Sequence, residues 1–307
     1  MVSSKKSENR SHSDPSDGYS NEQRVSTQSV VMNAHHKDAL NSPLPFESLL
    51  PRFYTQILPE EILKLPIQES VATCHDCVEV PKYQPDLKCC TFHPFLPNYL
   101  VGQILEDQKS APSFVTEVLQ HKISKQEYVL PLGAVAPVKY QVEFNKYREA
   151  QFGQNPDWLC PYYDKKKSMC GIWRNRGSVC TTFYCHSSQG DEGKEFWRMA
   201  LDYLSYVEMA LAEEALVHLD FSPRQISDQL EYLNRHRGTR QELRSNSLEM
   251  KKAKALWNGY FDDQEVFYIK SLEIVKGFDK NQLAETMGEL GVGITQQLLK
   301  AGRIWTR

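Results

Sequence analysis

The stretch CGIWRNRGSVCTTFYC, residues 170–185, decides how this chain is interpreted, because it holds three of the eight cysteines in 307 residues. Nine and then four residues separate these cysteines, and Trp173, Arg174 and Arg176 lie between them. The stretch is too polar for a buried helix and too irregular for a strand. Bonds other than hydrophobic packing are therefore expected to hold it in place.

All the cysteines of the chain belong to one pattern, which consists of Cys74, Cys77, Cys89, Cys90, Cys160, Cys170, Cys180 and Cys185. The two-residue gap after Cys74 lets a tight turn aim two sulfurs at one centre, as in thiolate zinc sites and iron–sulfur clusters. Neighbouring residues of an extended chain point to opposite sides, so Cys89-Cys90 suits a multinuclear centre unless an unusual local turn brings the sulfurs together. Eight thiolates also exceed the four ligands of one tetrahedral zinc ion.

Other side chains near the cysteines have expected supporting roles. Cations and N–H donors offset the charge of clustered thiolates, and the candidates are Arg174, Arg176 and Lys165–Lys167. Three aromatic residues are expected to shield the centre from water, namely Trp173, Phe183 and Tyr184. The flanking histidines are expected to be solvated or supporting groups rather than ligands, and these are His75, His93 and His186.

Composition limits the class of protein. The formal net charge of -3 carries no general basic signal for nucleic acid. The first residues lack the apolar segment of a secretion signal, and no run reaches the roughly 18 apolar residues of a membrane span. We therefore expect a cytoplasmic protein that does not contact a membrane. Disulfides rarely persist in a reducing compartment, so clustered cysteines there favour metal binding or redox chemistry.

The chain is predicted to have three parts. Residues 1–43 are polar, lack an apolar period and are expected to be a disordered tail. Residues 44–192 form the predicted cysteine-cluster domain, and residues 193–307 form a helical region that packs on it. The predicted fold class is mainly α, with an irregular cysteine-rich metal-binding core, a helical C-terminal half and little β structure.

Apolar spacing and proline positions predict the helices. Short helices broken at Pro51 and Pro59 are expected within 46–65, followed by helices over 98–107 and 112–121. Residues 128–144 are β-prone but interrupted by prolines, which predicts an extended connection or a short edge hairpin. Helices are further predicted over 194–219, from an N-cap at Ser222 to about His236, and over 242–260, 262–277 and 281–300. The glycines of 288–293 are expected to interrupt or end the last helix.

A basic stretch in the C-terminal half raises the alternative of nucleic-acid binding. Its cations lie between Arg235 and Lys254, but Glu231, Glu242 and Glu249 are interspersed with them. A solvated helix face explains this mixture better, so nucleic acid is not an expected partner.

The full pattern, with CPYYDKKKSMCGIWRNRGSVCTTFYC as its second part, resembles the YkgJ-type cysteine-cluster family of putative zinc- or iron-chelating domains. The similarity covers about residues 70–190, and a similar cluster occurs in the flagellin lysine N-methylases. This chain departs from the YkgJ-type pattern in two places. The spacing from Cys77 to Cys89 is longer, and the chain has Arg176-Gly177 where the family has arginine-proline. The resemblance implies that the eight cysteines are metal ligands.

Two functional hypotheses follow. The first is a metal-binding protein whose converging cysteine groups hold an iron–sulfur centre, expected as 4Fe-4S, or iron, with a redox or enzymatic role. The alternative is a structural zinc protein whose C-terminal helices bind another protein. The sequence decides neither whether a reaction is catalysed nor which partner or substrate is bound.

Overall fold

Helices dominate the computed structural model, which describes residues 43–69, 82–107, 113–184 and 187–306. The α-helices are α2 (Phe46–Leu49), α3 (Arg52–Ile57), α4 (Glu60–Leu63), α5 (Asn98–Asp107), α6 (Phe114–Lys125), α7 (Val138–Gln151), α8 (Ser178–Thr182), α9 (Gly190–His218), α10 (Pro223–Leu230), α11 (Met250–Trp257), α12 (Gln264–Lys276) and α13 (Lys280–Gly302). Single turns of 3-10 helix are η2 (Pro156–Trp158), η3 (Trp173–Asn175), η4 (Asn258–Tyr260) and η5 (Arg303–Thr306). The predicted mainly α fold is confirmed.

The strands described are short. They are β1 (Leu44–Pro45), β2 (Gln68–Glu69), β3 (Leu96–Pro97), β4 (Val129–Leu130), β5 (Gly133–Ala134), β6 (Tyr163–Asp164) and β7 (Met169–Cys170). They pair antiparallel as β1–β2, β3–β5–β4 and β6–β7. The prediction of little β structure is therefore confirmed for the described residues.

Prolines set the first helices as predicted. Pro51 and Pro59 are the N-cap residues of α3 and α4, and each helix begins at the next residue. Helix α5 has the predicted bounds. The helix predicted over 112–121 is α6, which begins at Phe114 and continues to Lys125.

The extended connection predicted over 128–144 is correct only in its first part. Strands β4 and β5 form a hairpin, and Gly133, the first residue of β5, has a φ of +146° that favours glycine. Pro137 is instead the N-cap of α7, so the second part of the segment is helical. A fixed proline φ also suits a helix start, and this reading was missed because β-prone residues precede it.

The C-terminal helices follow the prediction with changes at their ends. Ser222 caps α10 through a capping box with Gln225, as expected, but α10 ends at Leu230 rather than near His236. Helix α11 begins at Met250, well after the predicted start at 242. Gly288 has non-helical backbone angles inside α13, so the predicted interruption of the last helix is confirmed.

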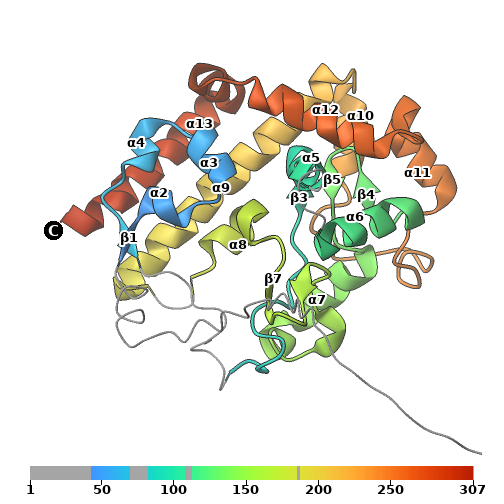
Figure 1. Cartoon of the computed structure of the whole chain (residues 1–307), viewed down its shortest axis with the longest axis horizontal. Coiled ribbons are helices and arrows are strands. Elements are labelled where there is room, and N and C mark those ends of the chain that lie inside the picture. Colours follow the sequence, from blue (N-terminus) through green and yellow to red (C-terminus); the bar gives the residue numbers. More distant parts are fainter. Residues whose placement is uncertain (1–42, 70–81, 108–112, 185–186, 307) are drawn as a thin grey trace, which may run out of the picture. The chain divides into compact units, whose positions relative to one another are not determined.

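The described residues all lie in one compact unit, 40–307, and share one hydrophobic core. Helix α9 packs against α8, α12 and α13, while α12 packs most extensively against α5 (Figure 1). Gly102 on α5 permits that last contact, because an added Cβ would lie 2.1 Å from the carbonyl oxygen of Tyr268 on α12. Helices late in the chain therefore cover elements that come early in it.

Polar contacts also join early and late segments. Asn98 donates from its side-chain amide to the Ala212 carbonyl at 3.0 Å, and Tyr268 donates to the Leu130 carbonyl at 2.7 Å. Helix α9 begins at Gly190, slightly before the boundary predicted between 192 and 193. The predicted tail, apart from Pro43, lies outside the described residues. No helix within the described ranges is long and apolar enough to cross a membrane.

Candidate functional site

Five of the eight candidate ligands fall within the described residues, and Cys74, Cys77 and Cys185 lie outside them. The flanking His75 and His186 also lie outside. The five described cysteines come from four short segments and are Cys89, Cys90, Cys160, Cys170 and Cys180. Cysteines 89, 90, 160 and 180 carry free thiols.

A tight turn places Cys89 and Cys90. Lys88 has a φ of +54°, and the Cys90 amide donates to the Leu87 carbonyl at 3.0 Å. The two neighbouring thiols are hydrogen-bonded to each other, and this contact, together with burial, raises the pKa of Cys89. A tight turn therefore brings the two neighbouring thiols together, and whether they share a metal centre stays a prediction.

Backbone hydrogen bonds connect this turn to the second cysteine group. The Cys160 amide donates to the Cys90 carbonyl at 2.7 Å, and the Tyr163 amide donates to the Cys160 carbonyl at 3.0 Å. Tyr163 on β6 pairs with Cys170 on β7. The Cys160–Cys90 hydrogen bond and the β6–β7 hairpin therefore connect the backbone segments that carry Cys90, Cys160 and Cys170.

An aromatic cluster supports the same region. Tyr140 and Phe144 on α7 contact Trp158, with ring centroids 6.0 and 5.4 Å apart, respectively. The Phe144 ring also meets Phe92, and Phe152 meets Phe183. Because these rings flank the cysteine segments in sequence, aromatic packing helps to hold this part of the backbone, and the expected metal bonds stay a prediction.

Four of the thiols influence one another electrostatically although they come from different segments. Burial first, and then the charges of Cys180, Cys170 and Cys89, raise the pKa of Cys160. Burial, Cys170 and Cys89 likewise raise the pKa of Cys180. Removing one proton from this group therefore makes removal of the next one harder, unless a cation enters.

Cationic side chains partly offset this effect. The charge of Arg176 lowers the pKa of Cys180, and that of Lys88 lowers the pKa of Cys89. The Lys88 ammonium donates to the Ser168 carbonyl at 2.9 Å, which holds it against the β6–β7 hairpin. Arg176 was a predicted charge partner, whereas Lys88 was missed although it directly precedes Cys89.

The described residues do not by themselves make a metal site, because no three of their His, Cys, Asp or Glu side chains form a group that could hold a metal ion. His93 has another role. Its Nε2–H donates to the Leu159 carbonyl at 3.0 Å, and its ring stacks 3.9 Å from that of Tyr140. Burial lowers the pKa of His93 to about 4. His93 is therefore a buried packing residue rather than a solvated one, and its expected supporting role at a metal centre stays a prediction.

A buried carboxylate lies beside α8, the helix that carries Cys180. Glu208 on α9 is only 3% exposed and accepts hydrogen bonds from the Ser178 amide at 2.7 Å, the Ser178 hydroxyl at 2.5 Å and the Tyr54 hydroxyl. Burial raises its pKa to about 7, although these hydrogen bonds oppose the shift. Sequence reasoning missed Glu208; its position four residues after Leu204, on the apolar face of α9, was the available signal.

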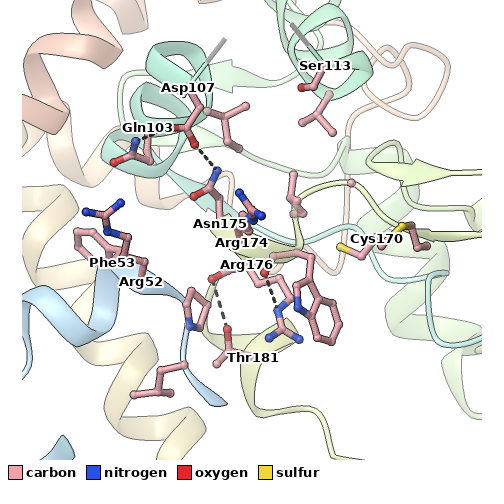
Figure 2. A pocket seen from close by; sticks show the side chains of 18 of the residues that line it. Arg52, Phe53, Gln103, Asp107, Ser113, Cys170, Arg174, Asn175, Arg176 and Thr181 are labelled. Carbon is pink, nitrogen blue, oxygen red and sulfur yellow. Dashed lines mark hydrogen bonds between the residues drawn. The ribbon is translucent and has the colours of Figure 1, made fainter. Parts of the chain in front are cut away.

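A cavity of about 1300 Å³ is lined by Cys170, a member of the cysteine group, and by Thr181, which follows Cys180 in sequence (Figure 2). Helix α3 contributes Arg52 and Phe53 to its wall, and η3 contributes Arg174 and the residues around it. The three aromatic residues expected to shield a metal centre all line this cavity, and these are Trp173, Phe183 and Tyr184. Phe183 is 43% exposed, so it does not cover a buried centre within the described part of the chain.

Arg176 is fixed at the edge of this cavity. Its guanidinium carbon lies 3.5 Å from the centroid of the Trp173 ring, and its Nε donates to the Trp173 carbonyl at 3.1 Å. The Arg176 carbonyl accepts from the Thr181 hydroxyl at 3.3 Å, which ties η3 to α8 (Figure 2). Arg176 therefore connects the η3 wall of the cavity to α8, the helix that carries Cys180.

No protein-family model matches the chain, and no curated protein or solved structure matches it either. The resemblance to the YkgJ-type family rests on the cysteine pattern and stays a prediction.

Proposed function

We propose that the chain is a metal-binding protein whose cysteines hold an iron–sulfur or iron centre with a redox or enzymatic role. The observation that carries the proposal is that separate segments meet at the cysteines: the Cys160 amide donates to the Cys90 carbonyl at 2.7 Å, and Tyr163, which donates to the Cys160 carbonyl, pairs with Cys170. A bound cation stabilises clustered thiolates, because it removes the penalty of their mutual repulsion.

The donor set suits iron–sulfur chemistry in its composition. Cysteine thiolates are the usual ligands of such clusters, and nearby cations and N–H groups raise the cluster potential. Arg176 and Lys88 are cations that act on the thiols of Cys180 and Cys89, respectively, and lower their pKa values against the effect of burial. The proposed centre takes its further ligands from Cys74, Cys77 and Cys185, which lie outside the described residues. The bound group would supply one-electron transfer.

Metal analysis of protein purified without oxygen and without added metal tests the proposal. Iron with acid-labile sulfide and a visible absorption band is the expected result. Stoichiometric zinc in a colourless protein would replace the proposal with the structural zinc alternative, and a metal-free protein would reject both.

A serine at position 180 provides the sharper test. Cys180→Ser removes one sulfur from α8, and we expect bound metal and the melting temperature of the loaded protein to fall together. Val179→Ser is the matched control, because its side chain is 36% exposed on the same helix and holds no thiol. Unchanged metal content in C180S, or equal loss in V179S, would contradict the assignment of Cys180 as a ligand.

A further inference from the structure

The cavity beside Cys170 has an excess of positive charge. Among the described residues, its wall contains five cationic side chains and two carboxylates, namely Arg52, Lys167, Arg174, Arg176 and Lys276 against Asp107 and Asp164. A concave surface of one sign concentrates counter-ions of the opposite sign. The charge balance therefore favours an anionic occupant.

Local pairing accounts for the lysines and the carboxylates. Lys276 pairs with Glu106 at 2.5 Å, and Lys167 pairs with Asp164 at 3.8 Å. Asp107 accepts hydrogen bonds from the side-chain amides of Gln103, at 2.8 Å, and Asn175, at 3.2 Å. The two lysines are thus paired with carboxylates, whereas Asp107 keeps its charge because its amide donors are neutral; the two positive charges of Arg52 and Arg174 outweigh it.

Arg52 and Arg174 are the two arginines on which the argument rests. Arg52 is the first residue of α3 and Arg174 lies in η3, so two elements far apart in sequence bring them to one cavity (Figure 2). Within the described chain, neither guanidinium has a carboxylate within ion-pair distance. An arginine fork binds a carboxylate or phosphate through two parallel N–H donors.

The rest of the wall is apolar and aromatic. Phe53, Ile104, Phe114, Ile172 and Trp173 face the same cavity. Phe53 is held by the ring of Tyr99, with centroids 4.7 Å apart, and Ile172 is 2% exposed, so this part of the wall is preformed. Ligand pockets commonly combine such a surface with a few polar groups that orient the ligand.

We propose that this cavity binds a small aromatic molecule that carries a carboxylate or phosphate group, with the anionic group between Arg52 and Arg174. The aromatic body contacts the apolar wall, and the ligand lies against the cysteine group through Cys170. This inference does not depend on a bound metal, because every contact it uses belongs to the protein.

Calorimetric titration of the full chain tests the site with four probes: phenyl phosphate, benzoate, inorganic phosphate and benzyl alcohol. We expect saturable binding of phenyl phosphate or benzoate, and the tighter of the two identifies the anionic group. Benzyl alcohol and inorganic phosphate, which each lack half of the ligand, are expected to bind at least about tenfold more weakly. The proposal would be overturned if benzyl alcohol or inorganic phosphate bound as tightly as the aromatic anions. It would also be overturned if neither phenyl phosphate nor benzoate showed saturable binding.

Variants locate the binding. Arg52→Ala and Arg174→Ala are each expected to weaken binding of the aromatic anion at least about tenfold, because each removes a charge-assisted contact. Arg174→Lys keeps the charge without the fork and should lose less. Arg224→Ala is the matched control, since Arg224 is exposed on α10 and does not line the cavity. Unchanged affinity in both alanine variants, with melting temperatures kept, would refute the site.

The metal proposal and this one fail separately. Iron content measured on the same samples reports the first, whereas dependence of probe affinity on the two arginines reports the second. Iron-free protein that still binds phenyl phosphate through Arg52 and Arg174 would remove the first and support the second.

Discussion

Replacing Glu208 with glutamine should remove a pH dependence of stability that the buried carboxylate causes. The folded protein raises the pKa of this group from 4.5 to about 7, mainly by burial. In the unfolded chain the group ionises near its ordinary pKa. Between these two values, the folded state therefore holds a proton that the unfolded state has released.

The sign follows from this proton. Between pH 4.5 and 7 the folded state binds more protons than the unfolded state. Raising the pH therefore destabilises the folded state relative to the unfolded state, so the free energy of unfolding falls as pH rises from 4.5 through 7. The shift from 4.5 to about 7 corresponds to about 3 kcal/mol over the full window. Below pH 4.5 the contribution is fully present, and well above pH 7 it is lost.

Glutamine is a close substitute for the protonated acid. Its amide oxygen can accept from Tyr54 and the Ser178 amide, and its NH2 group can donate to the Ser178 hydroxyl, which already accepts from Ser205 at 2.9 Å. The variant therefore keeps the contacts that join α3, α8 and α9 but does not titrate. We expect E208Q to match the wild-type stability near pH 5, within about 1 kcal/mol.

Urea unfolding of wild type and E208Q at about pH 5 and about pH 8 makes the measurement. The stability of E208Q relative to wild type should rise by about 2 kcal/mol between the two pH values. Glu195→Gln on the same helix is the control, because Glu195 is paired with Arg198 at 2.7 Å and its pKa is lowered by that partner. A difference between E208Q and wild type that is the same at both pH values would refute the reasoning.

Two further predictions test packing and a second titrating group. Gly102→Ala should destabilise the protein by at least about 2 kcal/mol, because the added Cβ would meet the Tyr268 carbonyl. Gly293→Ala is the control and should not destabilise it, because an added Cβ there has nothing within 4 Å. Thermal unfolding of both variants is the measurement, and equal melting temperatures would show that α5 and α12 are not this close. Burial holds the pKa of His93 at about 4, so stability should fall as pH drops from 6.5 through 4, by about 3 kcal/mol in total. His93→Gln keeps an N–H for the Leu159 carbonyl and should flatten this acid limb; an unchanged limb in denaturation at several pH values would contradict the role given to His93.

Elements with strong local signals were predicted correctly. Pro51 and Pro59 fix a φ that suits helix entry, and Ser222 caps α10 with its own side chain, so neighbours in sequence determine these boundaries. Helix α7 was missed because Pro137 follows β-prone residues and was interpreted as a break. Tertiary contacts decide such cases, as when Gln141 on α7 donates to the Tyr232 carbonyl at 2.9 Å.

The site was predictable only in part. The cysteine pattern predicted that all eight cysteines are metal ligands. Cys89, Cys160, Cys170 and Cys180 influence one another electrostatically, and their role as ligands stays a prediction. Arg52 could not be linked to the cavity from sequence, because nothing local relates α3 to η3. Contacts between segments so far apart in sequence depend on the shared hydrophobic core, and they produce no periodic pattern of residues that could be recognised in the sequence.

The shared core also has a consequence for how the protein is made. Phe46 on α2 packs against Phe196 on α9, with centroids 5.5 Å apart, and α5 is covered by α12. During synthesis the apolar faces of α2 and α5 emerge long before their partners, so the nascent chain displays them uncovered. Contacts between such distant segments also slow folding. Newly synthesised chains should therefore depend on chaperones. Mutations that weaken α12 should increase aggregation of the new chains before they reduce the activity of the folded protein.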